Sequence, residues 1–186
     1  MKKTKKGLYH ITETQRSKKL REIIVNDKMQ QGYRYILSEP EGKNFAAGFE
    51  PELSPAEMLE MGVFEGKYLN DCQNEFPAGW WKNARLSPNG KADISQNCFR
   101  IKSRMSLQAW RQKGWIIAPD VRGWFQWYCR YYMGRRLPEI DAFQIKRWKA
   151  FKRHKIQVEK NCFIGDTDCR KKQRQALLQW AYNPWF

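Results

Sequence analysis

The sequence feature that most constrains the fold is RGWFQWYCRYYMGRR, residues 122–136, where large aromatic side chains surround a narrow polar stripe. On a helix, residues four apart share a face, so Arg122, Gln126 and Arg130 fall in one line and aromatic rings cover the rest. A helix that is apolar around most of its circumference belongs in the interior of a protein. The segment therefore predicts a buried central helix around which the other elements pack.

The ends and the polar stripe of this helix carry further predictions. Asp120 is placed to cap the N-terminus, and Gly134 can adopt the left-handed conformation that ends a helix. The stripe, extended by Arg135 and Arg136, has two interpretations. Its arginines either pair with acidic residues in a structural role, or they form a rail beside an aromatic wall that stacks bases and holds phosphates.

Charge is unevenly distributed along the chain and favours a polyanionic partner. The net charge of the 186 residues is +16. Residues 1–38 carry +7, residues 39–75 carry −7, and residues 82–186 carry +16. A basic excess concentrated in one segment is typical of nucleic-acid binding, because neutralised phosphates release counterions. The alternative is a basic, solvated surface without a dedicated partner.

A second helix, predicted from Glu139 to about Lys160, provides a candidate binding surface. Its predicted inner face consists of five apolar residues: Ile140, Phe143, Trp148, Phe151 and Val158. Its opposite face carries four basic residues with no acid among them: Lys146, Lys149, Arg153 and Lys160. Lysines and arginines in such a row favour phosphate contact over base reading, so we expect binding to be largely independent of sequence.

Local signals place the remaining elements. Ser54, Pro55 and Glu57 form a capping-box pattern before a short helix that Gly62 ends. Weaker patterns predict a helix over 14–29, a strand over 31–38, a short helix capped by Ser106 and a last helix over about 168–182. The expected fold is mostly α: a compact single helical domain with long ordered loops over residues 13–186, behind a disordered basic N-terminal arm of residues 1–12.

Candidate catalytic and metal-binding residues are few. The acids Glu65, Asp71 and Asp141 are candidates for a general base or a Mg²⁺ ligand near the arginines, although most carboxylates are structural or solvated. His154, Cys162 and Cys169 are weak zinc candidates, because the closely spaced cysteine pair typical of zinc sites is missing from the sequence. Five irregularly spaced cysteines favour reduced thiols. No phosphate-binding loop or serine elbow is present, and we predict no cofactor.

Three motifs carry a resemblance to a known family. PELSPAEMLEMGVFEGKYLND, RGWFQWYCRYYMGRR and QRQALLQWAY, about a quarter of the chain, resemble a family of small basic proteins of bacteria, phages and some algae and fungi. The resemblance extends over roughly residues 49–183. The family has no established activity, so the resemblance implies a shared fold and no catalytic residue. A fainter similarity is to helical domains of phage thymine-hypermodification enzymes and to helical DNA glycosylases, although the sequence lacks the glycosylase helix-hairpin-helix.

Three functional hypotheses follow. The first is a nucleic-acid-binding protein, with DNA favoured over RNA. The second is an enzyme that acts on DNA bases or the DNA backbone, with acids beside Arg122 and Arg130. The third is a structural protein of a ribonucleoprotein or a virion. The N-terminus MKKTKKGLYHI lacks the apolar stretch of a signal peptide, and no apolar run is long enough to cross a bilayer, so we expect a cytoplasmic protein that does not bind membranes.

Overall fold

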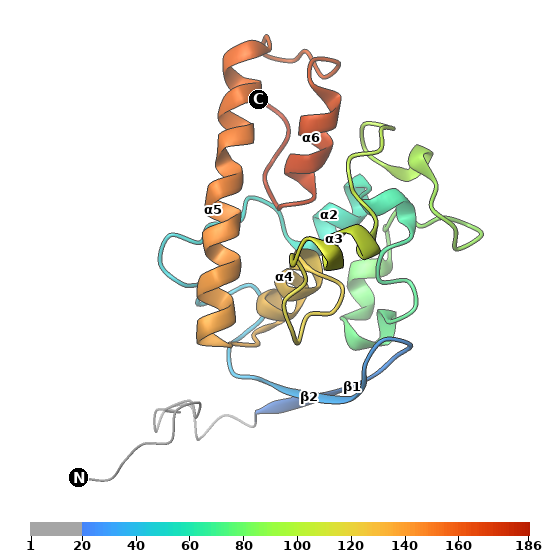
Figure 1. Ribbon diagram of the computed structural model, residues 1–186, viewed down its shortest axis with the longest axis vertical. Helices are drawn as coiled ribbons and strands as arrows, with labels where there is room; N and C mark the ends of the chain where they lie inside the picture. Colours follow the sequence, from blue (N-terminus) through green and yellow to red (C-terminus); the bar gives the residue numbers. More distant parts are fainter. Residues whose placement is uncertain (1–19) are drawn as a thin grey trace.

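The computed structural model describes residues 20–186, and helices predominate in it. Figure 1 shows a long helix, α5, standing beside α6, with α4 in the middle of the molecule and a β-hairpin at the end where α5 begins. The predicted N-terminal arm lies outside the described residues. Side chains from Val25 to Tyr182 belong to one hydrophobic cluster, so the described elements share a single core.

The hairpin joins β1 (Arg21–Asn26) and β2 (Gln31–Leu37) in antiparallel register, with Ile23 opposite Tyr35. β2 confirms the predicted strand. The helix predicted over 14–29 is wrong where the structure describes it, because residues 21–26 form β1; residues 14–19 lie outside the described part. Ile23, Ile24 and Val25 are β-branched, and such side chains fit a pleated strand better than a helix.

The capping-box helix is confirmed as α2 (Pro55–Met61). The Ser54 hydroxyl accepts a hydrogen bond from the Glu57 backbone N–H, and the Glu57 carboxylate accepts one from the Ser54 backbone N–H. Met58 and Leu59 are buried, and Gly62 ends the helix. Four 3₁₀ turns follow in the long loops, at Phe64–Gly66, Gln73–Glu75, Ala78–Trp81 and Ile94–Gln96. Ser106 then caps α3 (Leu107–Gln112), as predicted.

The central helix is α4 (Trp124–Met133), and its burial confirms the prediction. Trp127 and Tyr128 have no exposed surface, and the Tyr128 hydroxyl donates to the Leu53 carbonyl oxygen at 2.6 Å. Gly134 ends the helix in the left-handed conformation, where a Cβ atom would lie 1.9 Å from the Glu39 carbonyl oxygen. The predicted cap at Asp120 is wrong: α4 has Gly123 at its N-cap, and the Asp120 carboxylate is used elsewhere.

The second predicted helix is α5 (Pro138–Asn161), and α6 (Lys171–Leu178) packs beside it. Trp148 of α5 stacks on Tyr182, with ring centroids 4.8 Å apart. Two predictions need correction here. Phe143, assigned to the inner face, is 47% exposed, and the last helix stops four residues before Tyr182.

Candidate nucleic-acid interface

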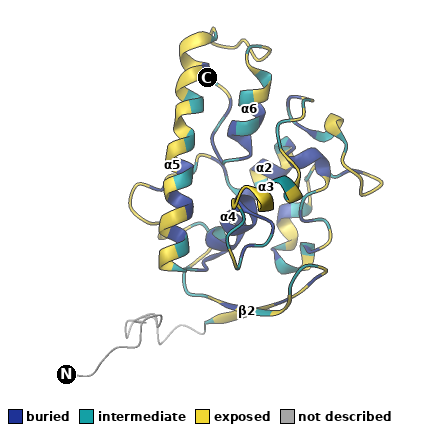
Figure 2. Cartoon of the chain, in the orientation of Figure 1, coloured by how far each residue is buried: buried dark blue, intermediate teal, exposed yellow. Residues whose placement is uncertain are grey.

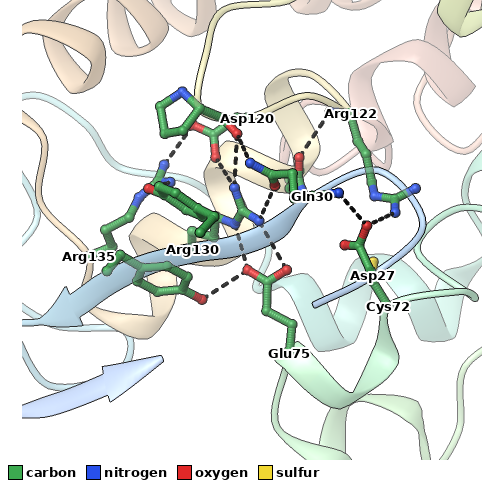
Figure 3. Close-up of polar contacts among 12 residues, drawn as sticks. Asp27, Gln30, Cys72, Glu75, Asp120, Arg122, Arg130 and Arg135 are labelled. Carbon is green, nitrogen blue, oxygen red and sulfur yellow. Dashed lines mark hydrogen bonds and ion pairs between the residues drawn. The ribbon is translucent and has the colours of Figure 1, made fainter. Parts of the chain in front are cut away.

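The polar stripe of α4 lies inside the protein, within a buried ion-pair network that Figure 3 shows. The network consists of seven residues from separate segments: Asp27, Asp71, Glu75, Asp120, Arg122, Arg130 and Arg135. Four carboxylates therefore surround three guanidinium groups. The loops after β1 and α2 bring three of the acids to the helix, and the segment before α4 brings the fourth.

Arg130 is the centre of the network, and its side chain has no exposed surface. Its guanidinium group donates to both carboxylate oxygens of Glu75, at 2.5 and 3.1 Å, and to Asp120 at 3.0 Å. Burial alone lowers the pKa of Arg130, but the hydrogen bonds and charges of Glu75 and Asp120 outweigh burial and raise it above its ordinary value. Arg130 is therefore charged and fully paired.

Arg122 and Arg135 occupy the two sides of the network. Arg122 donates to Asp27 at 2.9 Å and to Asp71 at 3.1 Å, and Arg135 donates to Asp120 at 2.6 Å. The two side chains are 7% and 1% exposed. Guanidinium groups that are buried and already paired with carboxylates are not available to a phosphate while the protein is folded.

These positions correct the predicted binding surface. Arg122, Gln126, Arg130 and Arg135 are structural: Gln126 is fully buried, and its side-chain oxygen accepts from the Arg122 backbone N–H at 2.9 Å. Arg136, unlike these four residues, is only half-buried. It donates to the backbone carbonyl oxygens of Tyr131 and Lys43 and lies 3.9 Å from the centre of the Tyr131 ring.

The three catalytic candidates have separate partners. Glu65 is buried and accepts from Arg104 at 2.6 Å, and Asp71 accepts from Arg122. Asp141 accepts from the Trp127 indole N–H at 2.8 Å and from the Leu137 backbone N–H, and burial raises the pKa of its carboxyl group. No contact joins the three acids within residues 20–186, so the structure does not bring them together as one site.

The zinc candidates also have other roles. Cys162 and Cys169 form a disulfide, which corrects the prediction of reduced thiols for this pair: the turn between α5 and α6 brings their Cα atoms to 5.7 Å, a separation that suits a bridge. Cys72, Cys98 and Cys129 are free. His154 packs on Phe151, and burial together with the charge of Arg153 lowers its pKa.

One other group of possible metal ligands, Asp27, Cys72 and Glu75, has ligand atoms within 4.8 Å of one another. Asp27 and Glu75 are already ion-paired with Arg122 and Arg130. Burial raises the pKa of the Cys72 thiol to about 12, which disfavours the thiolate that binds metals. Two neighbouring guanidinium groups also repel a cation, so the group belongs to the ion-pair network.

The basic residues predicted on the outer face of α5 form an exposed row, which we call the basic row. The basic row consists of Lys146, Lys149, Arg153 and Lys160. All four are exposed, and none has an ion pair among the described residues. The first and last lie fourteen residues apart, about 21 Å along the helix axis. Figure 2 shows the outward side of α5 exposed along most of its length.

Sequence reasoning missed the acids that neutralise the arginines. Asp27, Glu75 and Asp120 were not assigned to them. Of these three acids, only Glu75 lies in the acidic segment 39–75, which was a usable signal that basic residues would find partners inside the protein. The same acids explain why α4 and α5 differ. The acidic segment supplies Glu75 to Arg130 of α4 and Asp71 to Arg122 just before it, whereas no described carboxylate forms an ion pair with the basic row of α5.

Comparisons with known proteins do not add a name or a family. The chain matches no known family, no curated protein and no solved structure. Of the helices in residues 20–186, none has the length and apolar character that crossing a membrane requires.

Proposed function

We propose that the protein binds nucleic acid, with DNA favoured over RNA, through largely sequence-independent contacts between phosphates and the basic row of α5. The observation that carries this proposal is the row itself: four exposed cations on one helix side without acidic partners in the described part of the chain. Lys155, which is also on α5 but outside the row, pairs with Glu52.

The chemistry of the row supports phosphate contact rather than base reading. Lysine is a flexible point charge that contacts phosphate without selecting a base. Four neutralised phosphates on duplex DNA correspond to a slope of about −4 in a plot of log affinity against log salt. Because all four residues lie on one helix of 24 residues, the helix backbone fixes the spacing of the positions from which the charged side chains extend.

The test is charge reversal of the row with a matched control. The row variant carries Lys146→Glu, Lys149→Glu and Arg153→Glu, and the control variant carries Lys28→Glu, Lys82→Glu and Lys91→Glu. All six side chains are exposed, and both variants change the net charge equally. We expect both to melt like the wild type, because none of the six contributes to the core.

Binding to a 20-base-pair DNA duplex is then measured by fluorescence anisotropy over a range of salt concentrations. The row variant should lose at least about tenfold in affinity, and its salt slope should flatten by about three units, whereas the control should change by less than one unit. Equal losses in the two variants would show that bulk charge, not the row, drives binding. A wild type that does not bind at low salt would refute the proposal.

A further inference from the structure

A cleft of about 470 Å³ opens beside the basic row, between α3, α5 and α6. Its aromatic lining includes Trp110, Trp115, Phe151 and Trp180. Arg153 lines the cleft as well and is a member of the basic row, so the two surfaces are continuous. The volume is within the range of about 300–1,000 Å³ that is typical of small-molecule sites.

The rings of the cleft form a fixed wall and an open edge. Trp180 stacks on Phe151 with centroids 4.9 Å apart and an angle of 11° between the ring planes, and the Arg147 guanidinium lies 5.4 Å from the Trp180 ring. Trp115 stacks on no other aromatic ring in residues 20–186 and is 43% exposed, and the Lys113 ammonium lies 5.5 Å from the centre of its ring. A tryptophan ring exposed at the edge of a cationic cleft is the arrangement on which bases of single strands stack.

The wall of the cleft also contains buried polar groups without hydrogen-bond partners. Gln179 lines the cleft and is only 6% exposed, and its side-chain Nε2 has no hydrogen-bond partner in the described part of the chain. Arg104 also lines the cleft, and its Nε atom has no hydrogen-bond partner either. The ion pair with Glu65 holds the Arg104 side chain in place. A buried donor without a partner is costly, so both groups favour a ligand that brings acceptors.

We propose that the cleft binds one unstacked base of a nucleic-acid strand whose phosphates lie on the basic row, an inference that rests on the proposed function. The base stacks on the aromatic edge at Trp115, and its carbonyl or ring-nitrogen acceptors face Gln179 and Arg104. Apolar ligands satisfy neither donor. An aromatic peptide side chain offers at most one hydroxyl, whereas every base offers ring or carbonyl acceptors on a planar π-face.

The consequence is a preference for single-stranded over duplex DNA, because a base in a duplex must be unstacked before it can enter. The test compares a mixed-sequence 12-nucleotide strand with its duplex. Trp115→Ala should lower affinity for the single strand by about tenfold and leave duplex affinity within about twofold. Gln179→Met keeps the volume of the side chain but removes its amide, and it should lower single-strand affinity by about fivefold.

Trp185→Ala is the matched control. Trp185 is 41% exposed and packs on Phe99, away from the cleft, so its removal should leave both affinities unchanged. The row variant should weaken binding of single strand and duplex alike. If Trp115→Ala and Gln179→Met bind the single strand like the wild type, the cleft inference is overturned while the proposed function stands. If the wild type binds neither DNA, both are refuted.

Discussion

α4 with the arginines at its two ends and α5 both carry several positive charges, yet the structure uses these charges in opposite ways. The arginines of α4 and of the segment that follows it are almost completely buried and paired with carboxylates, whereas the basic row of α5 is exposed and has no acidic partner in residues 20–186. Removing the charge of Arg130 leaves the buried Glu75 without an ion pair. Removing a charge from the basic row of α5 breaks no ion pair in the described part of the chain and changes only the electrostatic potential at the surface. The difference separates the charges that maintain the fold from those available to a ligand.

The comparison also shows why a large net charge does not locate a binding site. The partner acids of Arg130 lie 55 and 10 residues away in the sequence, and only folding brings them together. An aromatic helix with arginines therefore fits a stacking platform and a core helix equally well at the sequence level. Burial decides between the two, and it assigns α4 to the core.

The largest effect is expected from Arg130→Ala. The substitution leaves Glu75 without an ion pair in the interior and Asp120 with Arg135 as its remaining ion-pair partner, and breaking a buried pair in this way costs about 3–5 kcal/mol of unfolding free energy. Because Arg130 serves two acids, we expect a cost near the upper end, measured by urea unfolding. Arg34→Ala is the control: its pair with Glu22 is exposed and should contribute less than about 1 kcal/mol. Equal destabilisation by both substitutions would contradict the assignment.

Trp127→Ala should lower the free energy of unfolding by a similar or slightly smaller amount, about 3–5 kcal/mol, because the ring is fully buried and its removal creates a cavity. The loss includes the hydrogen bond from the Trp127 indole to Asp141. Trp185→Ala, at an exposed ring, should melt within about 1 kcal/mol of the wild type. Near-native melting of Trp127→Ala would mean that α4 is not the core helix.

Parts of the fold could be predicted because their signals are local. The capping box of α2, the glycine at the end of α4 and the aromatic coverage of α4 depend on residues close in the sequence. β1 could not be found in this way, since its thin apolar stripe also fits a helix and its pairing with β2 decides the outcome. The cap at Asp120 failed because distant arginines compete for the same carboxylate.

A dependence on pH is expected from Asp27→Asn. Burial raises the pKa of the Asp27 carboxyl, but the backbone N–H groups of Met29 and Gln30 and the Arg122 guanidinium outweigh burial, so the pKa lies below its ordinary value. The stability that Asp27 contributes is therefore present above the unfolded pKa of about 4 and is lost as the pH falls through the folded pKa. Urea unfolding should show a deficit for Asp27→Asn at pH 7 that shrinks as the pH falls below about 4. A deficit that does not change with pH would argue against an ionised Asp27.

The smallest effect is expected from a single change in the basic row. Lys149→Ala should flatten the salt slope of DNA binding by about one unit, equally for duplexes of different sequence, while leaving stability unchanged. Lys82→Ala is its control, because Lys82 is equally exposed but lies far along the chain from α5. A loss that depends on the DNA sequence would mean that the row reads bases.

Part of the candidate site could also be predicted, because its signal is local in the sequence. The basic row follows from helical spacing, so Lys146, Lys149, Arg153 and Lys160 could be placed on one face before the structure was known. The cleft could not be predicted. Its lining residues Trp115, Phe151 and Gln179 come from three separate segments, and only the packing of α3, α5 and α6 brings these segments together. Arg122 and Arg135 were misassigned because exposure cannot be read from charge.

Lysine reactivity mapping tests the central claim most directly. The protein is acetylated briefly with and without bound DNA duplex, and the modified lysines are quantified by mass spectrometry. We predict that DNA protects Lys146, Lys149 and Lys160, while Lys28, Lys82 and Lys91 react equally in both samples. Protection of Lys28, Lys82 and Lys91, with Lys146, Lys149 and Lys160 still reactive, would contradict the assignment of the binding surface to α5.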